Sequence, residues 1–176
     1  MIAIVLLWVG ATLVLNGLWL LGRIRDDREI AVINLVTAAV GAIVAFGSAL
    51  RPGATVTGDI AFGAFVLLFA VTYLWVALGR LLKLGGHGLG WYCLFVAITA
   101  FPVGIEILLQ ARQPWGYWLG INWLAWGVLW FLYFVLLVLG RVGNRIVGWL
   151  TVLEGVLTCW VPAYLLLMGH LTPTIA

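Results

Sequence analysis

The sequence predicts an all-α integral membrane protein whose six transmembrane helices form three two-helix hairpins within a single domain, residues 1–176. Composition is the first observation: 65% of the residues are hydrophobic and 9% are charged, whereas a soluble domain carries about 25% charged residues. The second observation is that the apolar residues fall into six long runs, and the third is that short polar breaks separate these runs. Such a chain is expected to bury its apolar surface in a bilayer.

The six predicted spans cover nearly the whole chain. A membrane-crossing helix needs about 20 mainly apolar residues. The runs that meet this requirement are residues 2–22, 30–50, 59–79, 90–110, 117–139 and 148–168. Backbone polar groups in hydrocarbon must bond within their own segment, which makes each run a helix. A β-barrel would show alternating segments of about ten residues, and the sequence has none.

The orientation follows from the basic residues in the breaks, since cytoplasmic loops carry an excess of Lys and Arg. The first, third and fifth breaks hold Arg23, Arg25, Arg28, Arg80, Lys83, Arg141 and Arg145, whereas the second and fourth hold Arg51 and Arg112. The odd-numbered breaks are therefore predicted to be cytoplasmic, with both termini outside the cytoplasm.

A faint internal repeat favours the hairpin arrangement. Spans one, three and five each end in Leu-Gly-Arg, at residues 21–23, 78–80 and 139–141. Glycine commonly follows a helix end, so the repeat has two explanations: three hairpins in series, or similar helix-stop chemistry that arose independently.

Glu154 is the most informative polar residue, because it lies about six residues inside the last span, at a depth of roughly 9 Å. A carboxylate at that depth is unfavourable unless it faces a cavity or a partner, and no basic residue lies at matching depth. It either faces a wet pathway or is held by hydrogen bonds, with or without a proton.

Aromatic residues suggest where such a pathway would run. Trp123, Trp126 and Trp130 have the i, i+3, i+7 spacing of one helix face, and they lie too deep for an interfacial belt. Phe69 and Tyr73 share a face of the third span, with Tyr73 at the depth of Glu154. Helix packing alone would produce the same pattern, so both readings stay open.

Asn16 and Asn34 lie at matching depths in the first two spans. A side-chain hydrogen bond between polar residues is a common way to join two membrane helices. We therefore predict that these two asparagines bond to each other and fix the first hairpin.

Several function classes are not supported by the sequence. The basic residues are scattered rather than clustered, which argues against a nucleic-acid partner. His87 and His170 lie at span ends, and no metal-ligand cluster, phosphate loop or nucleophile–base set is visible. We expect no enzyme activity, cofactor or metal. An aromatic path with one deep carboxylate suits a small, neutral, planar solute that binds weakly enough to pass.

At these residues the sequence resembles the AmiS/UreI family of urea and short-chain amide channels. The resemblance is carried by the segments 123–130 (WLAWGVLW), 153–158 (LEGVLT) and 160–162 (WVP). Support comes from residues 6–17 of the first span, from 72–74 (TYL), and from 91–92 (WY) with 94–98 (LFVAI). It implies a multi-pass protein of the bacterial cytoplasmic membrane. It also implies a homohexameric ring, with a pore in each protomer and lipid filling the centre of the ring.

The resemblance also implies which residues line that pore. They are Ile2, Leu6, Val9 and Leu13 in the first span, Phe69 and Tyr73 in the third, Trp123, Trp126, Leu129 and Trp130 in the fifth, and Glu154 in the sixth. The expected function is passive conduction of urea or short amides, without a preference between them. A proton-coupled amide transporter using Glu154 and a non-transporting scaffold or sensor remain as alternatives.

Conduction is predicted to need no acid activation. The resemblance implies that acid-gated members carry long outer loops with titratable groups, whereas the outer breaks here, 51–58 and 111–116, are short and lack His and acidic residues. Urea flux into proteoliposomes should therefore be similar at about pH 7 and about pH 5, the range over which histidine titrates. Empty liposomes at each pH provide the control, and a several-fold rise at the lower pH would refute this expectation.

Overall fold

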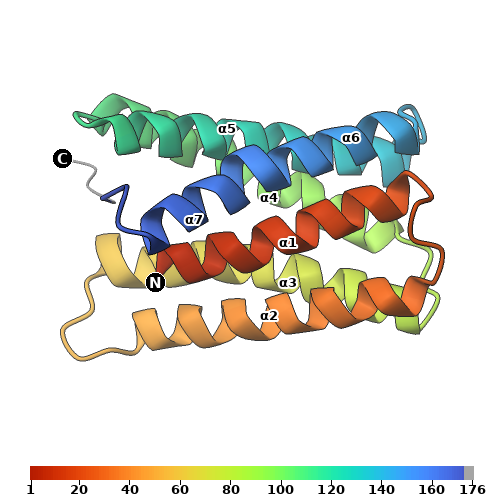
Figure 1. The fold of residues 1–176 in the computed structure, drawn as a ribbon, viewed down its shortest axis with the longest axis horizontal. Coiled ribbons are helices and arrows are strands. Elements are labelled where there is room, and N and C mark those ends of the chain that lie inside the picture. Colours follow the sequence, from red (N-terminus) through yellow and green to blue (C-terminus); the bar gives the residue numbers. More distant parts are fainter. Residues whose placement is uncertain (173–176) are drawn as a thin grey trace.

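The computed structural model describes residues 1–172 as helices joined by short loops (Figure 1). Six helical passes are long and apolar enough to cross a membrane, which confirms the number predicted. The elements are α1 (Ile2–Leu20), α2 (Asp27–Ala49), η1 (Val56–Ile60), α3 (Ala61–Leu81), α4 (His87–Gln110), α5 (Pro114–Phe134), η2 (Val135–Leu139), α6 (Asn144–Glu154), η3 (Gly155–Trp160) and α7 (Val161–Leu167). The three η elements are π-helical turns that continue into the adjacent α-helices.

Several passes begin a few residues before the predicted spans, because helices continue through polar residues that an apolar pattern omits. The second pass begins at Asp27 rather than residue 30. Its start is fixed by Asp26, whose side chain accepts a hydrogen bond of 2.8 Å from the backbone nitrogen of Arg28. An acidic residue in this position satisfies a free N–H group and favours the positive end of the helix dipole.

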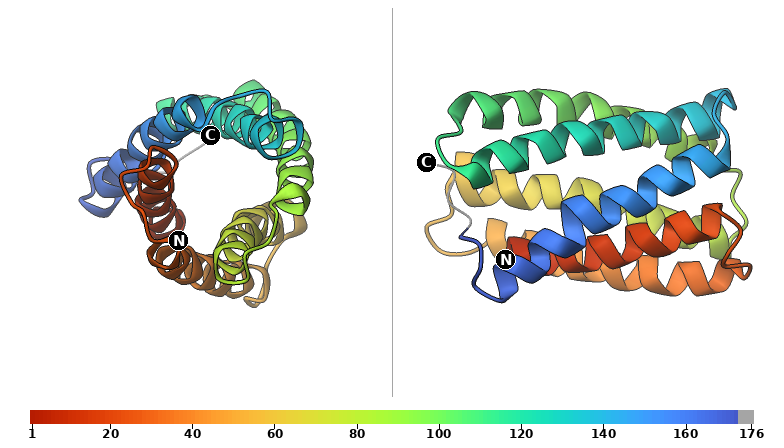
Figure 2. Two further views of the ribbon diagram at one scale, coloured as in Figure 1. Left: turned by 90° about the vertical axis from the view of Figure 1, so that its right-hand side faces the viewer. Right: turned by 45° about the horizontal axis from the view of Figure 1, so that its top comes forward.

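The passes are arranged in a ring, as the view along the bundle shows (Figure 2). The most extensive packing joins α2 to α3, α4 to α5, and α1 to the last pass formed by α6, η3 and α7. The predicted hairpins pair spans one with two, three with four and five with six. Those consecutive helices are neighbours around the ring, but they are not its most closely packed pairs.

Glycines explain why α1 packs so closely on the last pass. A Cβ added to Gly17 would lie 2.7 Å from the carbonyl oxygen of Gly148, and one added to Gly10 would lie 3.0 Å from that of Gly155. Both contacts are seven residues apart on each helix, so one face of α1 meets one face of the last pass at backbone distance. Small residues permit this approach where the bilayer supplies no hydrophobic force between helices.

The chain passes back and forth, so α1, α3 and α5 run in the same direction. The start of α1 and the end of α7 lie at the same end of the bundle (Figure 1). We call this end the Glu106 end and the opposite one the Arg80 end, after residues of α4 and α3 that lie there. Their assignment to outside and cytoplasm remains a prediction from the loop charges.

Polar side chains join α1 to α2 at two levels. Asn16 and Asn34 bond reciprocally, with Nδ2 to Oδ1 distances of 3.1 and 2.7 Å, as predicted from their matching depths. One turn before Asn16 in α1, the hydroxyl oxygens of Thr12 and Thr37 are 2.6 Å apart. All four residues are buried, so these bonds replace the water contacts that the bilayer does not offer.

Asn34→Ala should lower the free energy of unfolding by about 1–2 kcal/mol, since it leaves the Asn16 amide without its partner. Unfolding in mixed micelles, followed by circular dichroism, would measure this for Asn34→Ala, Asn16→Ala and the double variant. Asn144→Ala, at the exposed start of α6, is the control. Strictly additive losses for the pair would show that the two amides do not act together.

Candidate functional site

The ring encloses a cavity of about 1070 Å³ that is lined by faces of α1, α3, α4 and α5. Its walls include Ile2 and Glu106 toward one end of the bundle and Leu20 and Arg80 toward the other. The cavity therefore extends over most of the length of the bundle. The α2 helix lies behind α1 and α3 and contributes no lining residue among those described.

An aromatic cluster from α3 and α5 occupies the middle of the cavity wall. The Phe69 ring centroid lies 5.5, 5.6 and 4.6 Å from the centroids of Trp123, Trp126 and Trp130. The planes of Phe69 and Trp130 are 29° apart and therefore stacked, whereas those of Phe69 and Trp126 meet at 79°. These distances lie in the range of attractive aromatic pairs, so the rings hold one another in place.

The structure brings ten of the eleven predicted site residues to the cavity. These ten are Ile2, Leu6, Val9, Leu13, Phe69, Tyr73, Trp123, Trp126, Leu129 and Trp130. Helical spacing in the sequence identified the aromatic residues among them, and the family resemblance supplied Leu129 and the four residues of α1. Whether they contact a passing solute stays a prediction.

Glu154 is the exception, because it is not among the residues that line the cavity. It is the last residue of α6 before η3, and its side chain is partly buried. Its Oε2 atom is shielded and has no hydrogen-bond partner among the described residues. The position of Glu154 inside the last pass follows from the sequence, and whether its carboxyl group meets a passing solute stays a prediction.

Two threonines of the last pass hold two cavity rings of α5. The Trp126 Nε1 donates to the Thr158 hydroxyl at 2.8 Å, and that hydroxyl donates to the Glu154 carbonyl at 2.6 Å. Tyr133 repeats this arrangement seven residues later. Its hydroxyl lies 3.0 Å from that of Thr151.

The direction of the second bond follows from the proton count. Thr151 donates its only hydroxyl proton to the Val147 carbonyl at 2.7 Å, so Tyr133 must be the donor to Thr151. The indole of Trp126 and the phenol of Tyr133 therefore both direct their polar hydrogens toward the last pass. What they present to the cavity is their ring surface.

Other lining residues were not predicted from the sequence. Phe65, Leu119 and Tyr133 extend the α3 and α5 stripes by one or two turns, so the same helical spacing contained the signal. Glu106 and Arg80 lie at the two ends of the cavity.

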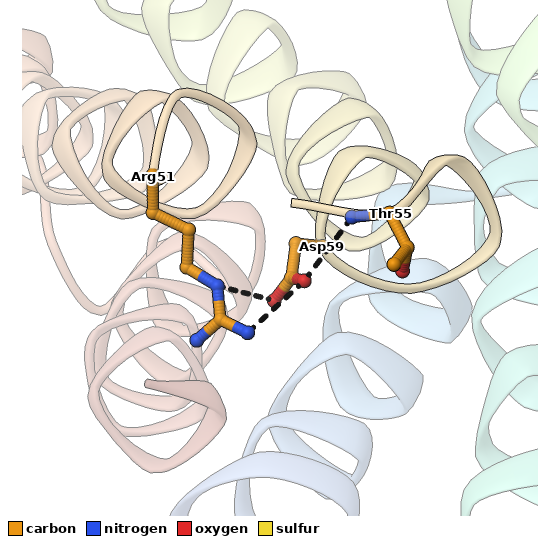
Figure 3. Close-up of polar contacts among 3 residues, drawn as sticks. All are labelled: Arg51, Thr55 and Asp59. Atoms are coloured by element: carbon orange, nitrogen blue, oxygen red, sulfur yellow. Dashed lines mark hydrogen bonds and ion pairs between the residues drawn. The ribbon is translucent and has the colours of Figure 1, made fainter. Parts of the chain in front are cut away.

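An ion pair shapes the turn at the Glu106 end (Figure 3). The Nε of Arg51 lies 3.1 Å from Oδ1 of Asp59, and its Nη2 donates to Oδ2 at 3.2 Å. Asp59 belongs to η1, just beyond the break at 51–58 that the sequence analysis described as free of acidic residues. This end of the protein therefore carries two carboxylates, Asp59 in η1 and Glu106 in the cavity wall.

Comparison with known proteins identifies the family. The profile described as AmiS/UreI family transporter matches residues 1–170. The chain belongs to the AmiS/UreI family. A putative transporter protein, AmiS2, from Rhodococcus erythropolis is 37% identical over 174 residues, which are 97% of this chain and 82% of that protein. An acid-activated urea channel of Helicobacter pylori is 37% identical over 194 residues, covering 97% of this chain and 99% of the channel.

Solved structures of the AmiS/UreI family support the fold. The crystal structure of the Helicobacter pylori urea channel matches with a TM-score of 0.85 and 33% identity. The match covers 98% of this chain and 100% of the urea channel chain. A cryo-electron microscopy structure of the same channel in a closed state matches with a TM-score of 0.82 and 35% identity. The protein is thus a multi-pass membrane protein of a family of channels and transporters.

Thr158→Val should release the Trp126 indole, because valine has a similar shape but cannot accept the Nε1 hydrogen. We expect a loss of about 1 kcal/mol in unfolding free energy and a lower apparent melting temperature in detergent. Thr99→Val is the matched control, since Thr99 is half-buried and makes the same type of bond to a carbonyl four residues back, at 3.0 Å, without an indole partner. Equal effects of the two changes would mean that the Trp126 bond contributes nothing.

Proposed function

We propose that this protein is a passive channel for urea, short-chain aliphatic amides or both, with one aromatic-lined pathway in each protomer. The observation that carries the proposal is the long cavity with the Phe69 and tryptophan cluster in its wall. Among the described lining residues, only Glu106 and Arg80 carry a formal charge, and they lie at its opposite ends. A charged solute would lose its hydration in the middle without gaining a counter-ion.

The cluster suits a flat, neutral solute. Ring faces give dispersion contact to a planar molecule without holding it by strong directional bonds, and conduction requires binding weak enough for release. Relatives support this substrate class. Helicobacter pylori has the acid-activated urea channel, and a protein of Mycolicibacterium smegmatis that is 40% identical over 169 residues is described as a putative amidate substrates transporter.

The proposal includes a placement in the membrane. We infer a bacterial cytoplasmic membrane, with the Arg80 end on the cytoplasmic side and both termini outside, from the basic residues in the odd-numbered loops. We also infer a homohexamer with lipid at its centre, by analogy with the family. Large apolar side chains such as Ile43, Phe95 and Trp149 are exposed on the outside of the protomer, where lipid or a neighbouring copy would cover them.

A proton-coupled amide transporter is the second candidate, and the unpartnered Oε2 of Glu154 is the observation in its favour. A buried carboxyl group without a fixed partner can exchange a proton during transport. Coupled transport would accumulate the amide against its gradient when a pH difference is imposed, whereas a channel would only equilibrate it. A scaffold would show neither behaviour.

The flux test uses stopped-flow light scattering on proteoliposomes with gradients of urea, acetamide and butyramide at neutral pH. The wild type should equilibrate urea or acetamide far faster than empty liposomes. Trp126→Ala should reduce the ratio of acetamide to butyramide rates several-fold, since removing an indole from the wall widens the slot.

Trp149→Ala is the control for loss of a tryptophan, because Trp149 is 51% exposed on α6 and is not a cavity residue. It should leave the acetamide to butyramide ratio unchanged. Wild-type flux no faster than that of empty liposomes would refute the channel. An equal change of the acetamide to butyramide ratio in Trp126→Ala and Trp149→Ala would show that the aromatic cluster does not select between solutes.

A further inference from the structure

Arg80 is the one described basic residue that lines the cavity. It lies in the last turn of α3, and Asn16 and Trp19 of α1 share its end of the cavity. Its guanidinium carbon lies 4.7 Å from the centre of the Trp19 ring. That distance is within the range of an attractive cation–π contact, so the charge is held beside the pathway rather than extended into water.

The charge of Arg80 is only partly compensated. Its Nη1 is 3.9 Å from Oδ2 of Asp27, which is longer than a hydrogen bond. The other oxygen of Asp27 accepts a bond of 2.8 Å from the Trp19 indole. Asp27 is not a cavity residue, and its side chain is 52% exposed, against 22% for Arg80. The negative group thus faces water, and the positive one faces the cavity.

The Nε of Arg80 adds to this asymmetry, because it is buried and has no hydrogen-bond partner among the described residues. Glu106, the other charged cavity residue, lies at the far end and bonds to Gln110. It is too distant to neutralise Arg80. Any solute that traverses the cavity therefore passes a fixed positive charge at the Arg80 end.

We propose that Arg80 is a specificity-determining residue that excludes cations from the pathway while admitting neutral urea or amides. A fixed charge of one sign in the wall of a pathway with a low-dielectric surround repels ions of that sign. Neutral solutes experience no such barrier. The inference rests on the proposed channel function and adds a selectivity that the aromatic cluster, which sorts by shape, does not provide.

Guanidinium is a suitable probe, since it has the planar shape and nearly the size of urea but carries a positive charge. Uptake of radiolabelled urea and radiolabelled guanidinium would be compared in the same proteoliposomes. The wild type should take up urea much faster than guanidinium. Arg80→Gln should raise guanidinium uptake and lower the urea to guanidinium ratio at least about tenfold, the change expected when a nearby charge is removed from a partly buried site.

Two variants separate charge from shape. Arg80→Lys keeps the charge and should keep most of the wild-type ratio. Arg141→Gln removes an exposed arginine from the loop at the same end, outside the cavity, and should not alter the ratio. If Arg80→Gln does not insert, Arg80→Met retains the stem over Trp19 without the charge and serves in its place.

An unchanged ratio in the neutral variants would overturn the inference, because the apolar middle of the cavity would then exclude cations alone. Equal loss in Arg80→Lys and Arg80→Gln would also overturn it, since charge would not be the cause. Wild-type uptake of guanidinium as fast as that of urea would refute it while leaving the channel intact. Absence of urea uptake by the wild type would refute the proposed function together with this inference.

Discussion

Close approach of helix backbones at glycines is the constraint on which the rest of the structure depends. The contacts of Gly10 with Gly155 and of Gly17 with Gly148 close the ring by bringing α1 against the last pass. Gly104 and Gly120 do the same for α4 and α5, where a Cβ on either would lie 3.0 Å from the carbonyl of the other. Tight packing around the circumference uses the small faces of the helices. It leaves the larger side chains of α1, α3 and α5 to face the interior, where they line the cavity.

Hydrogen bonds then fix what those interior faces present. The hydroxyls of Thr158 and Thr151 accept hydrogen bonds from Trp126 and Tyr133. Each hydroxyl donates its own proton to a carbonyl of the same pass. Each bond is seven residues from its counterpart on both helices, so a single antiparallel register satisfies both. The rings of Trp126 and Tyr133 are consequently held at defined angles by bonds that point away from the cavity.

The sequence was sufficient for the spans, because a bilayer imposes a minimum length of apolar residues on every helix. Helical spacing was also sufficient for the shared faces of Phe69 with Tyr73 and of the three tryptophans, whereas the α1 residues came from the family resemblance. The sequence did not predict which helices pack most closely, because that depends on which glycines face each other. It placed Glu154 within the last pass, where the residue ends α6, and its role in the pathway stays a prediction. Arg80 was assigned to a loop because charge marked it as a break, although it occupies the last turn of α3.

The chemical character of the cavity follows from its ring surfaces and from which of its polar groups already have a partner. Trp126 and Tyr133 have partners on the last pass. Thr72 bonds to the Leu68 carbonyl at 2.9 Å. Under the proposed channel function, a solute between the cavity rings would gain dispersion contact from them. Binding weak enough for release favours flux over storage. Discrimination would then come from the width of the aromatic slot and from the charges at the two ends, and these two filters would act on different properties of the solute.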